Sequence, residues 1–339
     1  MHTTPRVIRA TPLEIVEALP RLIGYVPHRS LLLVAMGSPE NPAGPLRMRT
    51  AARFDLPTSQ EDTAGLTDAV RHVLTEGPLR GTPCLLAVLW DERLDLPIEQ
   101  AEQIASAVVG WTHAHTTTRV HTLVTVTAQK VLGWTHEEHD PVPVSRPRQE
   151  TTSVLQTELV ADGRAAAADR DALGASILPT EHARPLDQDM PAPEQMQQVW
   201  HRLLTHDAVP TSDLHVLAAA VTDQDTRSAI GSRILGLGLG EGDPNGLDLG
   251  PSLTMAQRFR MLSHLRATCR SVIVTGADLH AVTALTAWSV GDGTLANLAV
   301  DHALHLDAHH RMAALVASAM RAGIEPPPVR TDTSQGGPR

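Results

Sequence analysis

The sequence predicts an α/β protein, in which an N-terminal mixed-sheet α/β sandwich is followed by an all-α C-terminal domain. Three observations predict this class. In the first 145 residues, short aliphatic runs of strand length alternate with stretches of helical periodicity. A proline-rich stretch over 179–193 interrupts this alternation, and every element predicted after it is helical. A chain of 339 residues is long enough for two such domains.

The first predicted elements are a helix over 11–24 and a strand over 30–36. Thr11 can cap the helix, and Glu14 stands three residues later, where it can return the hydrogen bond. Leucines and valines recur at helical spacing, while Pro20 is expected to kink or end the helix. The continuous aliphatic run over 30–36 predicts a strand that is buried on both faces.

Helices and strands continue to alternate through the N-terminal half. The pattern of 47–56 predicts a strand that pairs with 30–36 in a hairpin. The other elements predicted here are strands over 83–90 and 120–132 and amphipathic helices over 59–76 and 97–113. Strands separated by helices in this order favour a mixed sheet with helices packed on it.

The C-terminal half has the pattern of helices joined by loops. Residues 135–150 are polar and proline-rich and carry no predicted element, and short helices are predicted over 150–163 and 169–174. The helices predicted further along are 194–206, 211–221, 223–237, 252–270, 277–290, 293–305 and 309–322. The predicted organisation is an α/β domain over 1–145, a linker with short helices over 146–193, a helical domain over 194–325 and a disordered tail over 326–339.

The composition argues against several classes of function. The formal net charge of −10 disfavours non-specific nucleic-acid binding, which depends on excess positive charge. Five tryptophans, two phenylalanines and one tyrosine are too few for platforms that stack bases or line a carbohydrate groove. No signal peptide or membrane-spanning run is visible, and Cys84 and Cys269 are isolated in apolar contexts. We therefore expect a cytoplasmic protein without a disulfide framework, a membrane partner or a cofactor.

A helical pair near the C-terminus resembles one tetratricopeptide repeat. The residues that carry the resemblance are Gly291, Asp292, Ala296, Ala303, Leu304, Leu306 and Asp307. An ordinary αα-hairpin is the alternative, because one unit is legible and a stable array needs about three. Leu295, Leu298 and His302 lie on a stripe of the second helix, which is either core or a groove for a protein partner or a second copy of the chain.

Five stretches, in order, carry a resemblance that covers nearly the whole chain. They are LPRLIGYVPHRSLLLVAM (19–36), ARFDLP (52–57), LVADGR (159–164), LAAAVTDQDTR (217–227) and TAWSVGDGTLANLAVDHALHLD (286–307). Together they resemble the actinobacterial DUF4192 family, a domain of unknown function. The resemblance implies an actinobacterial cytoplasmic protein, and it transfers no reaction.

Two groups of residues are candidates for a site. The imidazoles of His113, His115, His136 and His139 offer enough ligands for zinc, although His136 and His139 lack the i, i+4 spacing of the metalloprotease helix. The alternative is that a histidine-rich chain scatters such pairs on solvated loops. The second group consists of five polar residues: Arg164, Arg170, Asp171, Asp223 and Arg227. They could bind an anion or another ligand between the domains, or they could form ion pairs and helix caps.

The motifs of enzymes are otherwise missing from the sequence. There is no GxSxG nucleophile turn and no GxxxxGK[ST] loop, and the glycine repeat over 236–240 follows a predicted helix rather than a strand. We therefore expect a non-enzymatic regulatory or protein-interaction protein. One alternative is a metal-assisted or hydrolase-like enzyme that uses the histidines named above, and another is a nucleic-acid-associated protein of a mobile element.

Overall fold

The computed structural model divides the chain into two compact units. Met1–Asp169 with Arg321–Gly323 forms the first, here called the α/β unit, and Arg170–Met320 with Ile324–Arg339 forms the second, here called the helical unit. The structure describes residues 11–37, 48–57, 61–91, 108, 110, 112, 119–126, 130–135, 142–147, 153–161, 166–187, 190–237 and 249–327. Apart from three single positions, the helix predicted over 97–113 lies outside these residues.

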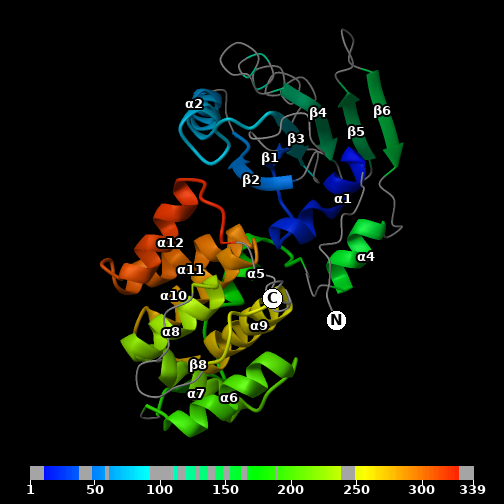
Figure 1. The fold of residues 1–339 in the computed structure, drawn as a ribbon. Helices are drawn as coiled ribbons and strands as arrows, with labels where there is room; N and C mark the ends of the chain where they lie inside the picture. The colour runs from blue at the N-terminus through cyan, green and yellow to red at the C-terminus, as the bar shows by residue number, and fades with distance from the viewer. Residues whose placement is uncertain are drawn as a thin grey trace, which may run out of the picture. The chain divides into compact units, whose positions relative to one another are not determined.

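The described strands of the α/β unit form one six-stranded mixed sheet (Figure 1). They are β1 (Ser30–Met36), β2 (Met48–Asp55), β3 (Cys84–Trp90), β4 (Arg119–Val126), β5 (Lys130–Thr135) and β6 (Val142–Pro147), in the order β2-β1-β3-β4-β5-β6. β1 pairs antiparallel with both β2 and β3, and β3 runs parallel to β4. The β4–β5 and β5–β6 pairs are antiparallel. The predicted hairpin is confirmed as the β1–β2 pair.

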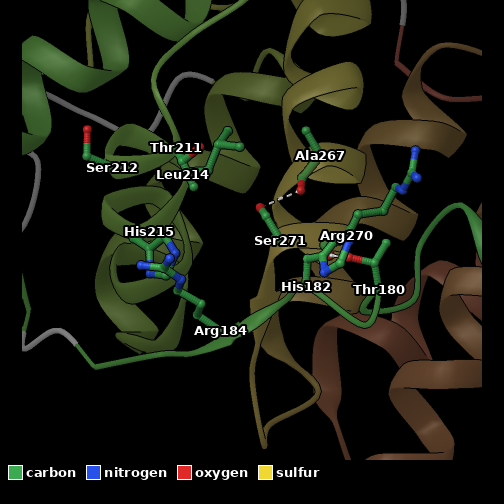
Figure 2. Close-up of a pocket in the computed structure, with 10 residues that line it drawn as sticks. All are labelled: Thr180, His182, Arg184, Thr211, Ser212, Leu214, His215, Ala267, Arg270 and Ser271. Atoms are coloured by element: carbon green, nitrogen blue, oxygen red, sulfur yellow. Dashed lines mark hydrogen bonds between the residues drawn. The ribbon is translucent and has the colours of Figure 1, made fainter.

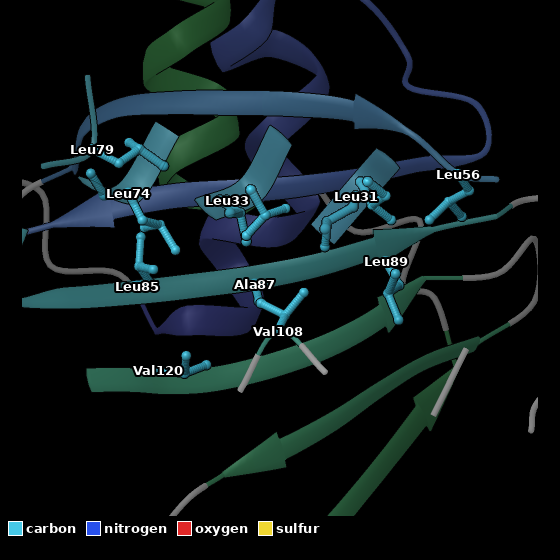
Figure 3. Packing of buried hydrophobic residues seen from close by; sticks show 13 residues of the cluster. Leu31, Leu33, Leu56, Leu74, Leu79, Leu85, Ala87, Leu89, Val108 and Val120 are labelled. Carbon is cyan, nitrogen blue, oxygen red and sulfur yellow. The ribbon is translucent and has the colours of Figure 1, made fainter. Parts of the chain in front are cut away.

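The centre of this sheet is aliphatic. All residues of β1 and β3 are buried, as the continuous apolar runs predict for strands covered on both faces. Leu31 and Leu33 of β1 and Leu85 and Leu89 of β3 belong to one cluster with Leu74 of α2 (Glu61–Thr75) (Figure 3). Because successive strand side chains point to opposite faces, this cluster takes alternate residues of each strand.

The first helix, α1 (Pro12–Ile23), begins with the predicted capping box. The Glu14 N–H donates to the Thr11 hydroxyl at 3.3 Å, and the Thr11 N–H donates to the Glu14 carboxylate at 2.7 Å. Pro20 lies inside the helix, which ends instead at Gly24, where φ is 88°. A glycine in the left-handed conformation is a common helix end, because it has no Cβ to clash.

Two expectations for the far side of the sheet were wrong. The segment 120–132 does not form one strand, because β4 and β5 are separate antiparallel strands. The proline-rich segment 135–150 contains β6, for which no element was predicted. β6 lies at the edge of the sheet, where Pro143 and Pro147 are tolerated because an edge strand need not donate every backbone N–H.

The helical unit consists mainly of short helices (Figure 1). They are α5 (Arg170–Ala175), α6 (Pro193–Thr205), α7 (Thr211–Thr222), α8 (Gln224–Leu235), α9 (Met255–Ser271), α10 (Asp278–Ser289), α11 (Gly293–Leu306) and α12 (Arg311–Arg321). The helices predicted beyond residue 193 are confirmed, with ends within three residues of the prediction. Their starts are capped locally: Asp223 caps α8, Thr254 and Gln257 form a capping box on α9, and Asp292 caps α11.

A two-stranded parallel ladder in the helical unit was not predicted. β7 (Arg184–Pro185) pairs with β8 (Val272–Ile273), which follows directly on α9. Two backbone hydrogen bonds of 3.0 Å extend the contact, from Thr180 N–H to Arg270 O and from Leu186 N–H to Ile273 O. This ladder holds part of the predicted linker beside the C-terminal end of α9.

The two cysteines are buried and free. Burial raises the pKa of the Cys269 thiol to about 12, so the thiol stays protonated near neutral pH and is a packing group rather than a nucleophile. Among the helices that the structure describes, none combines the length and the hydropathy that crossing a membrane requires.

Candidate functional site

Three segments of the helical unit surround a pocket of about 820 Å³, here called the basic pocket (Figure 2). They are residues 180–184, the N-terminal part of α7 and the last turn of α9. The described residues that line it are Thr180, His182, Arg184, Thr211, Ser212, Leu214, His215, Ala267, Arg270 and Ser271. The volume lies within the roughly 300–1,000 Å³ of small-molecule sites.

The β7–β8 ladder positions the cationic side chains of the basic pocket. Arg184 begins β7, opposite Val272 of β8. Figure 2 shows Arg184 extending toward His215 on α7, whereas the guanidinium of Arg270 is directed away from α7. The hydroxyl of Thr180 donates to Arg270 O at 3.0 Å and so fixes the loop that leads into β7. Arg184 is therefore the guanidinium best placed to meet a ligand in the pocket.

The basic pocket concentrates positive charge in an acidic chain of net charge −10. Two guanidinium groups and two imidazoles line it, and no Asp or Glu is among its described lining residues. Neither Arg184 nor Arg270 forms an ion pair with a carboxylate in the described segments. His182 lies 3.5 Å from Glu181, and both side chains are well exposed, so this pair is weak. Arg184 is exposed and has no ion-pair partner in the described segments, so its guanidinium is available to bind an anion.

The N-terminus of α7 adds to the positive potential of the basic pocket. Its N-cap is Pro210, which makes no side-chain cap. Asp213 in the first turn is paired instead with Arg202 of α6, through two hydrogen bonds of 2.7 and 2.9 Å. The carboxylate accepts these bonds and thereby raises the pKa of Arg202. The first backbone N–H groups of α7, beside Thr211 and Ser212, therefore keep the partial positive charge of a helix N-terminus.

Two of the residues predicted to bind a ligand hold helix ends together. Asp223 caps α8, where the backbone N–H of Thr226 donates to its carboxylate at 2.8 Å and lowers the pKa of Asp223. Arg227 donates to Val221 O at 2.8 Å and lies 2.7 Å from the carboxylate of Asp278. Asp223 and Arg227 thus join the end of α7 to the starts of α8 and α10.

A smaller pocket of about 220 Å³ lies beside this cluster and is lined in part by Asp278 and Thr222. His310 lies 3.0 Å from Asp278, and its Nδ1 accepts from the Ala313 N–H, so its Nε2 carries the proton given to Asp278. Arg227 already balances the charge of Asp278. Because these groups satisfy one another, they need no ligand, and the basic pocket is the better candidate site.

The other predicted ligand residues are not brought together in the described part of the chain. Arg170 and Asp171 are exposed at the start of α5, and Arg164 lies outside the described residues. Also outside them are the predicted metal ligands His113, His115, His136 and His139. Among the residues that the structure does describe, no group of three or more His, Cys, Asp or Glu side chains could hold a metal ion.

The three predicted partner-binding residues contact helices of their own unit. Leu295 is fully buried, and a Cβ at Gly174 of α5 would lie 3.8 Å from the Cδ2 of Leu298. The ring of His302 stacks on His280 of α10, with centroids 5.5 Å apart. Burial and the neighbouring His302 lower the pKa of His280 to about 4, so His280 is neutral at pH 7.

The basic pocket contains hydroxyls and imidazoles without a nucleophile–base pair. Among its described lining residues, no hydrogen bond joins a Ser or Thr hydroxyl to His182 or His215. The Ser271 hydroxyl donates instead to Ala267 O at 2.7 Å, one helical turn back. A nucleophile is normally activated by an adjacent base, so this arrangement suits binding rather than covalent catalysis.

Comparison with known families assigns most of the chain to one family. The model of a domain of unknown function, DUF4192, matches residues 12–327. The chain belongs to the DUF4192 family. The match covers the described elements of both units, so the basic pocket lies inside the DUF4192 domain. No curated protein and no solved structure matches the chain.

Sequence reasoning missed the basic pocket of this DUF4192 domain. Its residues come from separate segments, and Thr180 and Arg270, which are hydrogen-bonded, stand 90 positions apart. One local signal was present: His182 and Arg184 place two basic side chains in a stretch that otherwise has linker composition. Nothing in the local pattern indicates that α7 and α9 face that stretch.

Proposed function

We propose that this DUF4192 protein is a non-enzymatic regulatory protein that binds a small anion in the basic pocket. One observation carries the proposal: Arg184, His215 and the uncapped start of α7 meet at a pocket whose described lining contains no carboxylate. An anion there would accept charge-assisted hydrogen bonds, which are about twice as strong as neutral ones. The acidic remainder of the chain makes the basic character of this pocket a local feature.

The size of the pocket supports a molecule rather than a single ion. About 820 Å³ is far more than one oxyanion needs, and the walls include hydroxyls and the apolar side chains of Leu214 and Ala267. Small-molecule sites combine apolar walls with a few oriented polar groups in this way. Arg184 and the start of α7 would hold the anionic group, and the remaining walls would contact the body of the ligand.

The regulatory part of the proposal concerns the partner that would respond when the pocket binds its ligand. We propose that the helical unit associates with a protein partner or with a second copy, and that α10 and α11 pair in the manner of a tetratricopeptide repeat. Gly291, with a φ of 80°, and the cap Asp292 between these helices support the pairing. Leu306 and Leu315 are 48% and 69% exposed, which offers apolar surface. Free cysteines fit the cytoplasm, where we propose that the protein acts.

The direct test is calorimetric titration of the full chain with inorganic phosphate and with ethyl phosphate at low ionic strength. We expect both to bind, and we expect Arg184→Ala to weaken binding about tenfold or more, because a hydrogen bond to a charged group contributes roughly 1.5–3 kcal/mol. Arg311→Ala is the matched control, since it removes an exposed arginine outside the pocket and should leave the affinity unchanged.

Two results would contradict the proposed function. If neither phosphate binds, or if Arg311→Ala weakens binding as much as Arg184→Ala does, the basic pocket is not an anion site. Phosphorus NMR of ethyl phosphate after long incubation tests the non-enzymatic part. Release of inorganic phosphate that depends on Arg184 would show that the pocket catalyses a reaction.

A further inference from the structure

The hydroxyl groups of the basic pocket are of two chemical kinds. The hydroxyls of Ser271 and Thr180 donate their protons to backbone carbonyls, at 2.7 Å to Ala267 O and 3.0 Å to Arg270 O. A hydroxyl has one proton and two lone pairs, so these two oxygens can still accept hydrogen bonds but have no proton left to donate. A ligand that contacts them must bring its own donor.

The wall formed by α7 has the opposite character. Thr211 makes no side-chain hydrogen bond in the described part of the chain, so its hydroxyl proton is free to turn toward a ligand. Arg184 extends toward this wall in Figure 2, and a guanidinium can donate but not accept. This wall therefore favours an acceptor with negative charge.

The two kinds of group lie on different sides of the pocket. In Figure 2, Thr211, Ser212 and His215 belong to α7, while Ser271 and Thr180 lie across from them, at the end of α9 and in the loop beside it. A ligand that fills the pocket would place its anionic end on α7 and hydrogen-bond donors on the facing side. An anion that carries hydroxyl groups has this division.

The lining also argues against a nucleobase. No Phe, Tyr or Trp is among the described lining residues, whereas stacking on aromatic side chains is a main source of affinity for bases. Resting on the proposed anion-binding function, we propose that the ligand is a phosphorylated polyol of the sugar-phosphate class. Its phosphate is bound by Arg184 and the start of α7, and its hydroxyls donate to the oxygens of Ser271 and Thr180.

The test compares ligands of equal charge in calorimetric titrations of the full chain. The probes are a hexose 6-phosphate, ethyl phosphate, ribose 5-phosphate and AMP. The hexose phosphate is expected to bind about tenfold more tightly than ethyl phosphate, since each added neutral hydrogen bond contributes severalfold in affinity. AMP is expected to bind no more tightly than ribose 5-phosphate, because its base has no stacking partner.

Variants then assign the preference to the hydroxyl oxygens. Ser271→Ala and Thr180→Val should each reduce the advantage of the hexose phosphate over ethyl phosphate to about threefold or less. Ser318→Ala is the matched control, because the Ser318 hydroxyl also donates one turn back, at 2.8 Å to Ala314 O, but lies outside the pocket. Thr180→Ser should restore the preference.

The outcomes separate this inference from the function on which it rests. Equal binding of hexose 6-phosphate and ethyl phosphate would overturn the polyol assignment and leave anion binding intact. Tighter binding of AMP than of ribose 5-phosphate would overturn it in favour of a nucleotide. If no probe binds at all, the proposed anion-binding function fails, and the polyol assignment fails with it.

Discussion

The central strands of the α/β unit and the helices of the helical unit bury different side chains. β1 and β3 bury mainly leucine, valine and alanine, and Ser30 at the start of β1 is buried as well. The helical unit buries Arg258, His264, His280 and several threonines among its apolar residues. Both units are folded around cores, but only the helical core includes charged and titratable groups to this extent among the described residues.

The difference follows from which backbone carbonyls can accept a second hydrogen bond from a nearby side chain. Inside a helix, a Thr or Ser hydroxyl can share the carbonyl one turn back: Thr268, Thr283 and Thr286 donate to the carbonyls four residues earlier, at 2.7–2.8 Å. In a central strand the carbonyls are used by the ladder, and side chains stand away from the backbone. A buried hydroxyl is therefore easier to satisfy in the helical unit, where the candidate site also lies.

The largest effect is expected in the aliphatic sheet. Leu33→Ala should lower the free energy of unfolding by about 2–5 kcal/mol, because the cavity left in a fully buried site does not close. Urea denaturation measures the loss, with Leu315→Ala as the control, since Leu315 is 69% exposed. A loss below 1 kcal/mol for Leu33→Ala would mean that the sheet core repacks freely.

The next effect is a pH dependence confined to the helical core. Burial lowers the pKa of His280 from 6.5 to about 4, so the unfolded chain takes up a proton first as the pH falls. Above pH 6.5, His280 is neutral in both the folded and the unfolded chain, and the free energy of unfolding has its full value. Between pH 6.5 and pH 4 this free energy falls by about 3 kcal/mol in total.

The measurement for His280 is the slope of unfolding free energy against pH in the chain and in His280→Phe. The variant keeps an aromatic ring but does not titrate, so its slope between pH 6.5 and 4 should be shallower. Equal slopes would show that His280 is readily protonated in the folded protein. His302, which stacks on His280, is the neighbouring imidazole to check in the same way.

The smallest effect is expected to be a gain in stability. Arg258 is 1% exposed, and in the described segments its Nε and Nη2 have no hydrogen-bond partner, while its Nη1 lies 3.4 Å from Ser289 O. Burial lowers the pKa of Arg258, because the charged form is poorly solvated there. Arg258→Met should therefore raise the free energy of unfolding by about 1–2 kcal/mol.

Thermal and urea unfolding test the gain, with Arg311→Met as the exposed control. A loss of stability in Arg258→Met would show that the carbonyl ends of helices compensate the buried charge. Ser289 ends α10, and Gly236, at the end of α8, lies close to Arg258 as well. In that case the charged group would make the helical core different in composition from the aliphatic sheet core, but it would not make the helical core less stable.

Much of the fold could be predicted because its signals are local. The aliphatic run of β1 and the pairing of Thr11 with Glu14 each act within a few residues. β6 could not be predicted, because Val142–Pro147 becomes a strand through the edge of a sheet built elsewhere in the chain. The β7–β8 ladder was missed for the same reason, since two-residue strands have no periodicity of their own.

The candidate site was less predictable than the fold. Asp223 and Arg227 were singled out as a possible ligand site, and the structure places them at helix ends, where they bond to carbonyls, backbone N–H groups and Asp278. Arg184 and His215 were not singled out. A motif search finds residues that are close in sequence, whereas the basic pocket needs three segments to converge.

The sequence by itself determined the alternating first half, the helical second half, most helix boundaries and the DUF4192 resemblance, because periodicity and capping are properties of short segments. The tertiary structure alone decided that β7 joins β8, that Arg184 faces α7 (Figure 2), and that Arg258 is buried with no carboxylate partner among the described residues. Local patterns specify which face of an element is apolar. Which faces then meet depends on packing over the whole unit, and that packing creates the basic pocket.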